Sequence, residues 1–170
     1  MEQKGFVFAA EAPYPQVKVK CMNQMYAREM ASNIGACNSE MSAVSLYFYN
    51  SIIARETYKE ISDCFHKIMI VEMHHLDIFG RLAYLLGADP RLWAYTRRRP
   101  IYWSPGCNQY PRQLKDLLQN ALRGEEEAIR KYKRQAESIR DPYVVANLQR
   151  IIEDENIHVE IFQTLCRQYL

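Results

Sequence analysis

Glutamate, histidine and tyrosine residues recur in this sequence in a pattern that occurs twice. In the first copy, Glu40 is followed by Tyr47 seven residues later and by Glu72-x-x-His75 about thirty residues later. The second copy has the same residue types at nearly the same spacing: Glu125, Tyr132, Glu155 and His158. A glutamate and a histidine three residues apart lie on one face of a helix, so both can bind the same small ion. Two such pairs and two further glutamates form the ligand set of four-helix bundles that hold two metal ions.

We therefore predict a site for two metal ions. Its six ligands are Glu40, Glu72, His75, Glu125, Glu155 and His158. Each falls in the apolar stripe of a helical pattern, where a carboxylate is costly unless it is paired or bound to a cation. A single Glu-x-x-His is more often a solvated surface pair. Two such motifs at core positions of a helical pattern, each preceded by a matching Glu and Tyr, favour metal binding. We expect Glu72 and Glu155 to bridge the ions, with the other four ligands at the two ends.

The two tyrosines are candidate catalytic residues. Tyr47 and Tyr132 lie two turns beyond Glu40 and Glu125 on nearly the same helix faces, so they could hydrogen-bond the ligands or carry electrons. The equally good alternative is that they are core tyrosines with satisfied hydroxyl groups. Four further residues lie off the ligand faces, and we assign them to the surface or to supporting positions: His74, Glu126, Glu127 and Glu153.

Four helical stretches must position these residues. Apolar residues recur with the period of a helix over about residues 24–54, 56–86, 111–139 and 142–170. Gly87 and Pro90 supply a stop signal for the second stretch. Pro111 and Pro142 suit helix starts, where the missing N–H is harmless.

Residues 88–110 are the longest link in this pattern. They can cross the bundle, whereas the short links between the first two and the last two helices suit antiparallel neighbours. A length of 170 residues with 48% hydrophobic content is enough for one domain with a substantial core. We therefore predict an all-α four-helix bundle over residues 21–170, with a long crossover between helices 2 and 3, and an extended N-terminal arm over residues 1–20.

Composition restricts the partners and the compartment. No apolar run approaches the roughly 20 residues of a membrane span, and the N-terminus lacks the features of a signal peptide. The five cysteines never form a C-x-x-C, which argues against a rubredoxin-type iron centre or a zinc ribbon on this chain. A net charge of +2 and one short basic cluster, Arg97–Arg99, do not suit a nucleic-acid surface. We expect a cytoplasmic protein with single cysteines, as in a reducing cytosol, and no membrane or nucleic-acid partner.

The duplicated pattern resembles that of a known superfamily. Ala36-x-x-x-Glu40 and Ala121-x-x-x-Glu125, each with a tyrosine seven residues later and a Glu-x-x-His beyond it, are similar to the ferritin-like superfamily in its rubrerythrin and manganese-catalase branches. The resemblance extends over about residues 13–168. It implies a ferritin-like bundle whose ligands are the six residues already chosen from their spacing.

Shorter segments refine this resemblance. Residues 14–19 and 35–43 are similar to the start of small spore-coat proteins of the manganese-catalase type. Rubrerythrins carry an extra ligand glutamate three residues after the third-helix glutamate, but Ala128 stands there, and the electron-delivering rubredoxin domain is missing. A rubrerythrin peroxidase cycle would therefore need a separate redox protein as electron donor.

These observations favour a dimetal oxidoreductase that acts on peroxide or dioxygen. Carboxylate and imidazole ligands suit both iron and manganese. Catalase-type disproportionation needs no external reductant, so it suits a chain without a second redox centre. Two alternatives stay open: a ferritin-like protein that oxidises and stores iron, and a non-enzymatic spore-coat component with a structural or vestigial site. We expect a homodimer, because the crossover carries many aromatic residues, although these can equally pack on their own bundle.

Overall fold

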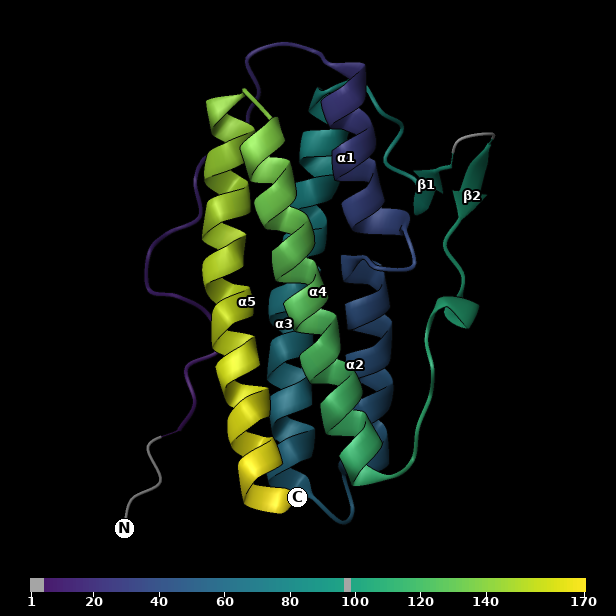
Figure 1. The fold of residues 1–170 in the computed structure, drawn as a ribbon, viewed down its shortest axis with the longest axis vertical. Helices are drawn as coiled ribbons and strands as arrows, with labels where there is room; N and C mark the ends of the chain where they lie inside the picture. The colour runs from purple at the N-terminus through teal and green to yellow at the C-terminus, as the bar shows by residue number, and fades with distance from the viewer. Residues whose placement is uncertain (1–4, 97–98) are drawn as a thin grey trace.

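The computed structural model describes residues 5–96 and 99–170, and these form a bundle of long helices (Figure 1). The helices are α1 (Gln24–Gly35), α2 (Glu40–Ala54), α3 (Lys59–Leu85), α4 (Leu114–Ser138) and α5 (Pro142–Tyr169). α2 packs on α3 and α4 on α5, while α1 continues the column of α2 beside α3. The predicted all-α four-helix bundle with a long crossover is confirmed. Among the described residues, no helix combines the length and apolar character needed to cross a bilayer.

The predicted first helix, residues 24–54, is broken in the structure. α1 ends at Gly35 and α2 begins at Glu40, and the backbone at Ala36 and Ser39 is extended. Two contacts stabilise this break. Gly35 packs so closely on the crossover that an added Cβ would lie 2.1 Å from the Trp93 nitrogen. The Lys131 ammonium donates to two carbonyl groups at the break. The apolar residues keep their helical spacing through residues 36–39, but these tertiary contacts interrupt the helix there.

Local signals explain most other helix ends. Asn23 and Asp141 cap α1 and α5, because their side chains accept hydrogen bonds from backbone N–H groups of the first turns. Pro142 opens α5 as predicted, but α4 begins at Leu114 rather than at Pro111. Gly87, with a φ of 102°, follows the end of α3 in the left-handed conformation that glycine tolerates.

The crossover between α3 and α4 contains a short hairpin and a 3-10 turn. β1 (Trp93–Tyr95) pairs antiparallel with β2 (Pro100–Tyr102) next to α1, and η1 (Pro105–Cys107) contacts α2. Cys107 forms a disulfide with Cys37, which lies in the break between α1 and α2. Our prediction of single cysteines is wrong for this pair, because the break and the crossover bring together two residues 70 positions apart. The free cysteines are Cys21, Cys64 and Cys166.

The N-terminal arm has no helix or strand over residues 5–20 and lies along α5 (Figure 1). Its backbone carbonyls at Ala10 and Ala12 accept hydrogen bonds from the Arg150 guanidinium of α5. The arm is therefore fixed to the last helix through its backbone. Residues 1–4 of the predicted arm lie outside the described residues, as do Arg97 and Arg98 of the basic cluster.

The core consists of two apolar clusters. One lies near α1, around Phe79 and Leu148, and the other near the α2–α3 turn, around Phe65 and Phe162. Along each long helix, the predicted ligands occupy the positions between these clusters. The bundle thus contains a polar layer with apolar packing on both sides along its axis.

Candidate metal centre

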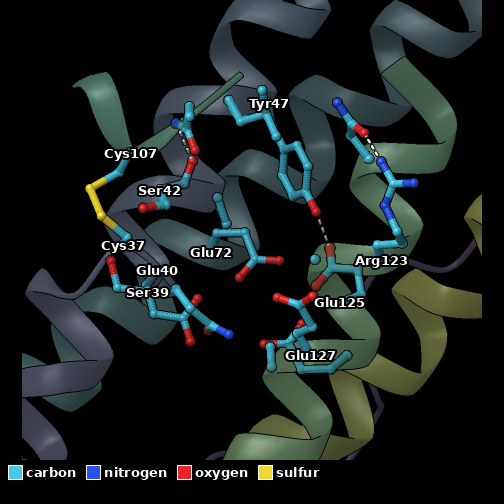
Figure 2. A pocket seen from close by; sticks show the side chains of 18 of the residues that line it. Cys37, Ser39, Glu40, Ser42, Tyr47, Glu72, Cys107, Arg123, Glu125 and Glu127 are labelled. Carbon is cyan, nitrogen blue, oxygen red and sulfur yellow. Dashed lines mark hydrogen bonds between the residues drawn. A yellow bond between two sulfur atoms is a disulfide. The ribbon is translucent and has the colours of Figure 1, made fainter. Parts of the chain in front are cut away.

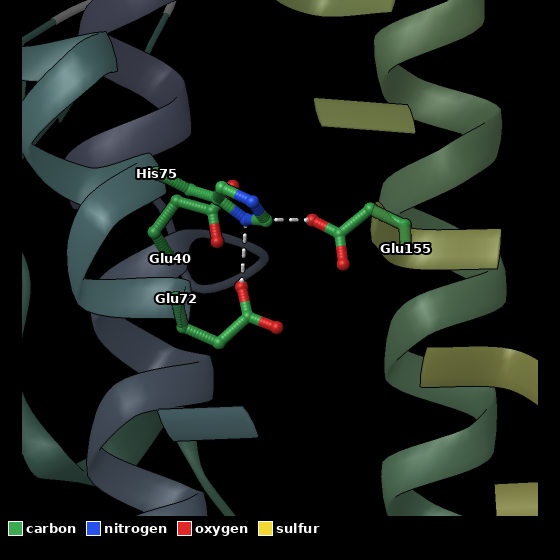
Figure 3. A group of neighbouring side chains, drawn as sticks. All are labelled: Glu40, Glu72, His75 and Glu155. Carbon is green, nitrogen blue, oxygen red and sulfur yellow. Dashed lines mark hydrogen bonds and ion pairs between the residues drawn. The ribbon is translucent and has the colours of Figure 1, made fainter. Parts of the chain in front are cut away.

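All six predicted ligands converge in this polar layer. Each is at most 2% exposed, and they come from four helices: Glu40 on α2, Glu72 and His75 on α3, and the remaining three on α4 and α5. They form two groups of four, with the ligand atoms of each group within 4.8 Å of one another. The first group is Glu40, Glu72, His75 and Glu155 (Figure 3). The second group is Glu72, Glu125, Glu155 and His158. Glu72 and Glu155 belong to both groups.

Both histidines turn the same ring nitrogen toward the carboxylates. His75 Nδ1 lies 3.2 Å from Glu72 Oε2 and 3.3 Å from Glu155 Oε1. His158 Nδ1 lies 3.0 Å from an oxygen of each of the same two glutamates. The two Nδ1 atoms therefore point at the shared carboxylates, where they can serve as metal ligands.

The other ring nitrogen of each histidine is held from outside the cluster. His75 Nε2 lies 3.0 Å from Asp154 Oδ2, and His158 Nε2 lies 2.9 Å from the Phe8 carbonyl oxygen. A carbonyl oxygen only accepts hydrogen bonds, so His158 carries a proton on Nε2. A partner that fixes Nε2–H leaves Nδ1 available as a ligand and fixes the orientation of the ring.

The protein alone does not satisfy this cluster. Glu72 Oε1 and Glu155 Oε1 are buried and have no hydrogen-bond partner among residues 5–96 and 99–170. Glu72 Oε1 does lie 3.0 Å from His158 Nδ1, but that nitrogen is equally close to Glu155 Oε2, and one N–H makes one good hydrogen bond. Unpartnered buried oxygens at the two shared glutamates, with imidazole nitrogens beside them, fit a pair of divalent cations.

The protonation of the cluster supports the same conclusion. Burial, together with the charges of Glu72 and Glu155, raises the pKa of Glu40 and of Glu125 well above the usual value. Burial alone would raise the pKa of Glu72 and lower that of the histidines. The attraction between these groups reverses both effects, so the pKa of Glu72 falls and that of His75 and His158 rises. Without cations, protons supply the positive charge that the four carboxylates require.

The two tyrosines make reciprocal hydrogen bonds. Tyr47 on α2 donates to Glu125 Oε1 on α4 at 2.5 Å, and Tyr132 on α4 donates to Glu40 Oε1 on α2. Burial and the neighbouring carboxylates raise the pKa of both phenols, so both remain protonated donors. Each tyrosine therefore contacts the glutamate of the opposite copy, not the glutamate two turns away on its own helix. Their role in catalysis stays a prediction.

Asp154 is a site residue that the sequence reasoning missed. It is fully buried and accepts hydrogen bonds from the Tyr14 hydroxyl, the Ala10 N–H and the Arg150 guanidinium, in addition to its contact with His75. Burial alone would raise the pKa of Asp154, but these donors lower it below the usual value. The sequence signals near Asp154 are weak, because two of its donors, Ala10 and Tyr14, come from about 140 positions away.

The residues assigned to positions off the ligand faces lie outside both groups. His74, Glu127 and Glu153 are exposed, and Glu126 is half-buried. Of these four, Glu127 lines the pocket described next.

A pocket of about 430 Å³ connects the cluster with the surface between α2, α4 and the crossover (Figure 2). Glu40, Glu72, Glu125 and Glu155 lie at its inner end. Figure 2 shows the disulfide at one edge and Arg123 at the other, with the carboxylates between them. Small residues contribute to the space, including Gly124 and Ala128, which occupies the position of the extra rubrerythrin glutamate. A small molecule can therefore reach the carboxylates from solvent.

Known structures share this fold. A manganese catalase, KatB from Anabaena PCC7120, aligns with a TM-score of 0.80 and 19% identity over 96% of this chain and 80% of its own. The bacterioferritin BfrA from Mycobacterium tuberculosis aligns with a TM-score of 0.69 and 17% identity over 87% of each chain. No curated protein sequence matches the chain. A sequence model of the rubrerythrin family matches residues 35–166, most of the chain, and the protein therefore belongs to the rubrerythrin family.

Proposed function

We propose that the protein is a dimetal oxidoreductase that acts on peroxide or dioxygen. The observation that supports this most strongly is that two four-residue groups share Glu72 and Glu155. These two glutamates would bridge the ions. Glu40 and His75 would complete the ligands at one end of the site. Glu125 and His158 would complete them at the other end. The donor set suits iron and manganese alike.

Two redox-active ions supply electron transfer and charge stabilisation to a bound O–O bond. The protein contributes a fixed ligand geometry, since Asp154 and the Phe8 carbonyl hold the histidines in one orientation. The tyrosine hydroxyls hold the two end carboxylates in place. The apolar clusters shield the site along the bundle axis, and the pocket gives a small substrate access to the shared carboxylates.

Peroxide is the substrate that we favour. The aligned KatB is described as a manganese catalase, and disproportionation of two peroxide molecules to dioxygen and water needs no electron donor. A peroxidase cycle would need electrons from another molecule, such as a separate redox protein. We retain the cytoplasm as the compartment, with the spore coat as the alternative, and a homodimer as the expected assembly.

The first test is metal analysis of protein purified without chelator. We expect close to two manganese or iron ions per chain in the wild type and loss of both in the double variant Glu72→Ala, Glu155→Ala. Glu153→Ala is the matched control, because Glu153 is exposed on α5, off the ligand face and outside both groups. Circular dichroism verifies that each variant is folded.

Peroxide turnover is measured on the same samples. Dioxygen release from hydrogen peroxide by the loaded wild type, but not by the double variant, supports the proposal. No bound metal after anaerobic reconstitution with either ion would contradict it. Ferric iron retained far beyond two ions per chain would favour iron storage instead.

A further inference from the structure

The Cys37–Cys107 disulfide lies on the wall of the same pocket as the metal cluster (Figure 2). Both cysteines line this pocket together with Glu40, Glu72 and Glu125. Cys37 is exposed and Cys107 is half-buried, so the disulfide lies at the protein surface. The pair is thus accessible both to a substrate in the pocket and to a reductant in solution.

The backbone around Cys37 lies near a helix N-terminus and an ammonium group. Cys37 lies two residues before Ser39, the N-cap of α2, and three residues before Glu40. Lys131 Nζ donates at 2.7 Å to the carbonyl of Asn38, the residue that follows Cys37. A helix N-terminus and a nearby ammonium group both stabilise a thiolate, which is the form that reacts with peroxides and disulfides.

The disulfide is not needed to attach the crossover. Trp103 Nε1 donates to the Ser42 hydroxyl at 2.9 Å, and Asn108 Nδ2 donates to the Ser42 carbonyl at 3.0 Å. Both bonds connect the crossover to α2 beside Cys107. The sulfur atoms can therefore separate while the pocket wall stays in place.

We propose that Cys37 and Cys107 form a redox-active dithiol that supplies two electrons for peroxide reduction in this pocket. This inference rests on the proposed dimetal function. In the step, each thiol gives up one electron and one proton and an S–S bond forms. The O–O bond of hydrogen peroxide breaks and takes up the two electrons and two protons, which gives two water molecules.

A soluble dithiol closes the cycle. It attacks the exposed disulfide, is itself oxidised to a disulfide, and returns Cys37 and Cys107 to thiols. The pair fits the cytoplasm that we predict, where disulfides are mostly transient and catalytic or redox-sensing rather than structural.

The test counts thiols in the full chain. Dithiothreitol treatment should raise the count from three to five per chain, because three cysteines are free and two are paired. The reduced, metal-loaded protein then receives one equivalent of hydrogen peroxide without oxygen and is quenched with an alkylating agent. We expect peptide mass spectrometry to find Cys37 joined to Cys107, with the other three cysteines alkylated.

Variants separate the pair from the other cysteines. Cys37→Ser, Cys107→Ser should lose dithiothreitol-dependent peroxide consumption, at least tenfold against the wild type. Cys21→Ser, Cys166→Ser is the matched control and should retain it, because neither residue lines the pocket. Reduced, metal-free protein should form the Cys37–Cys107 bond at least tenfold more slowly than loaded protein.

Two results would overturn the inference alone. One is peroxide consumption with dioxygen release while Cys37 and Cys107 remain thiols, which leaves the dimetal function intact. The other is equally fast disulfide formation in metal-free protein, which would show that the pair reacts independently of the cluster. Failure to bind metal would contradict the proposed function itself, and the metal analysis detects that separately.

Discussion

Tyr47 donates its hydroxyl hydrogen to Glu125, so the tyrosine of the first sequence copy supports the glutamate of the second. Tyr132 makes the reciprocal bond to Glu40. α2 and α4 are therefore connected twice through buried groups. Each copy of the pattern therefore depends on the other for the hydrogen bond to its first glutamate and for part of its four-residue group.

Replacing Tyr47 with phenylalanine should destabilise the metal-free protein. The change leaves a buried oxygen of Glu125 without its donor, which costs about 1–3 kcal/mol. Urea unfolding followed by circular dichroism measures this loss. Tyr84→Phe is the control, because Tyr84 is 67% exposed and its replacement should change the free energy of unfolding little. Equal stability of the two variants would show that the Tyr47 bond contributes nothing.

Replacing Asp154 with asparagine should affect both stability and metal binding. The variant leaves the buried Arg150 guanidinium without its carboxylate, which costs about 3–5 kcal/mol. It also removes the carboxylate that orients His75, so metal affinity should fall about 10- to 100-fold. Urea unfolding and metal competition with a chelator measure the two effects. Glu160→Gln, at an exposed position of α5, serves as the control, and unchanged metal affinity in Asp154→Asn would rule out the orienting role.

Metal binding should release protons. In the metal-free fold, the raised pKa values of Glu40, Glu125 and both histidines mean that the cluster holds protons that an unfolded chain lacks. Cations must displace these protons, so apparent metal affinity should weaken as the pH falls. Titration calorimetry in two buffers of different ionisation enthalpy measures the number released. A value of zero at pH 7 would contradict the protonation described above.

The same shifts predict how pH affects the metal-free protein. A glutamate whose pKa is raised by folding stabilises the fold while it is protonated, and this contribution is lost as the pH rises through the folded value. Above about pH 4.5, the usual range of a free glutamate, Glu40 and Glu125 should therefore make the metal-free protein less stable with rising pH. Bound metal should remove this decline, and melting temperatures with and without metal would show the difference.

Gly35 should not tolerate a methyl group. A Cβ there would lie 2.1 Å from the Trp93 nitrogen, so Gly35→Ala must displace the hairpin or the end of α1, at a cost of about 1–3 kcal/mol. Gly80→Ala is a matched control inside α3. Nothing lies within 4 Å of its Cβ, and alanine should stabilise that helix by about 0.5–1 kcal/mol. Thermal unfolding should shift in opposite directions for the two variants.

The sequence was sufficient to predict the bundle and the convergence of six residues. A helical period determines which side chains share a face, and a Glu-x-x-His repeated in core positions places both pairs in one layer. The same reasoning could not find Asp154 or the Phe8 carbonyl, because their roles depend on the path of an arm without regular structure. The break at residues 36–39 and the disulfide likewise follow from contacts with the crossover, which no local period encodes.

The contact of the N-terminal arm with α5 also sets the order of assembly during translation. The Phe8 carbonyl that holds His158 is made 150 residues before it, which corresponds to roughly 8–30 s at usual elongation rates. Until α5 has left the ribosome, no nascent chain can offer either ion its full set of ligands. Both four-residue groups can therefore form only after α5 has been synthesised, because each of them contains Glu155.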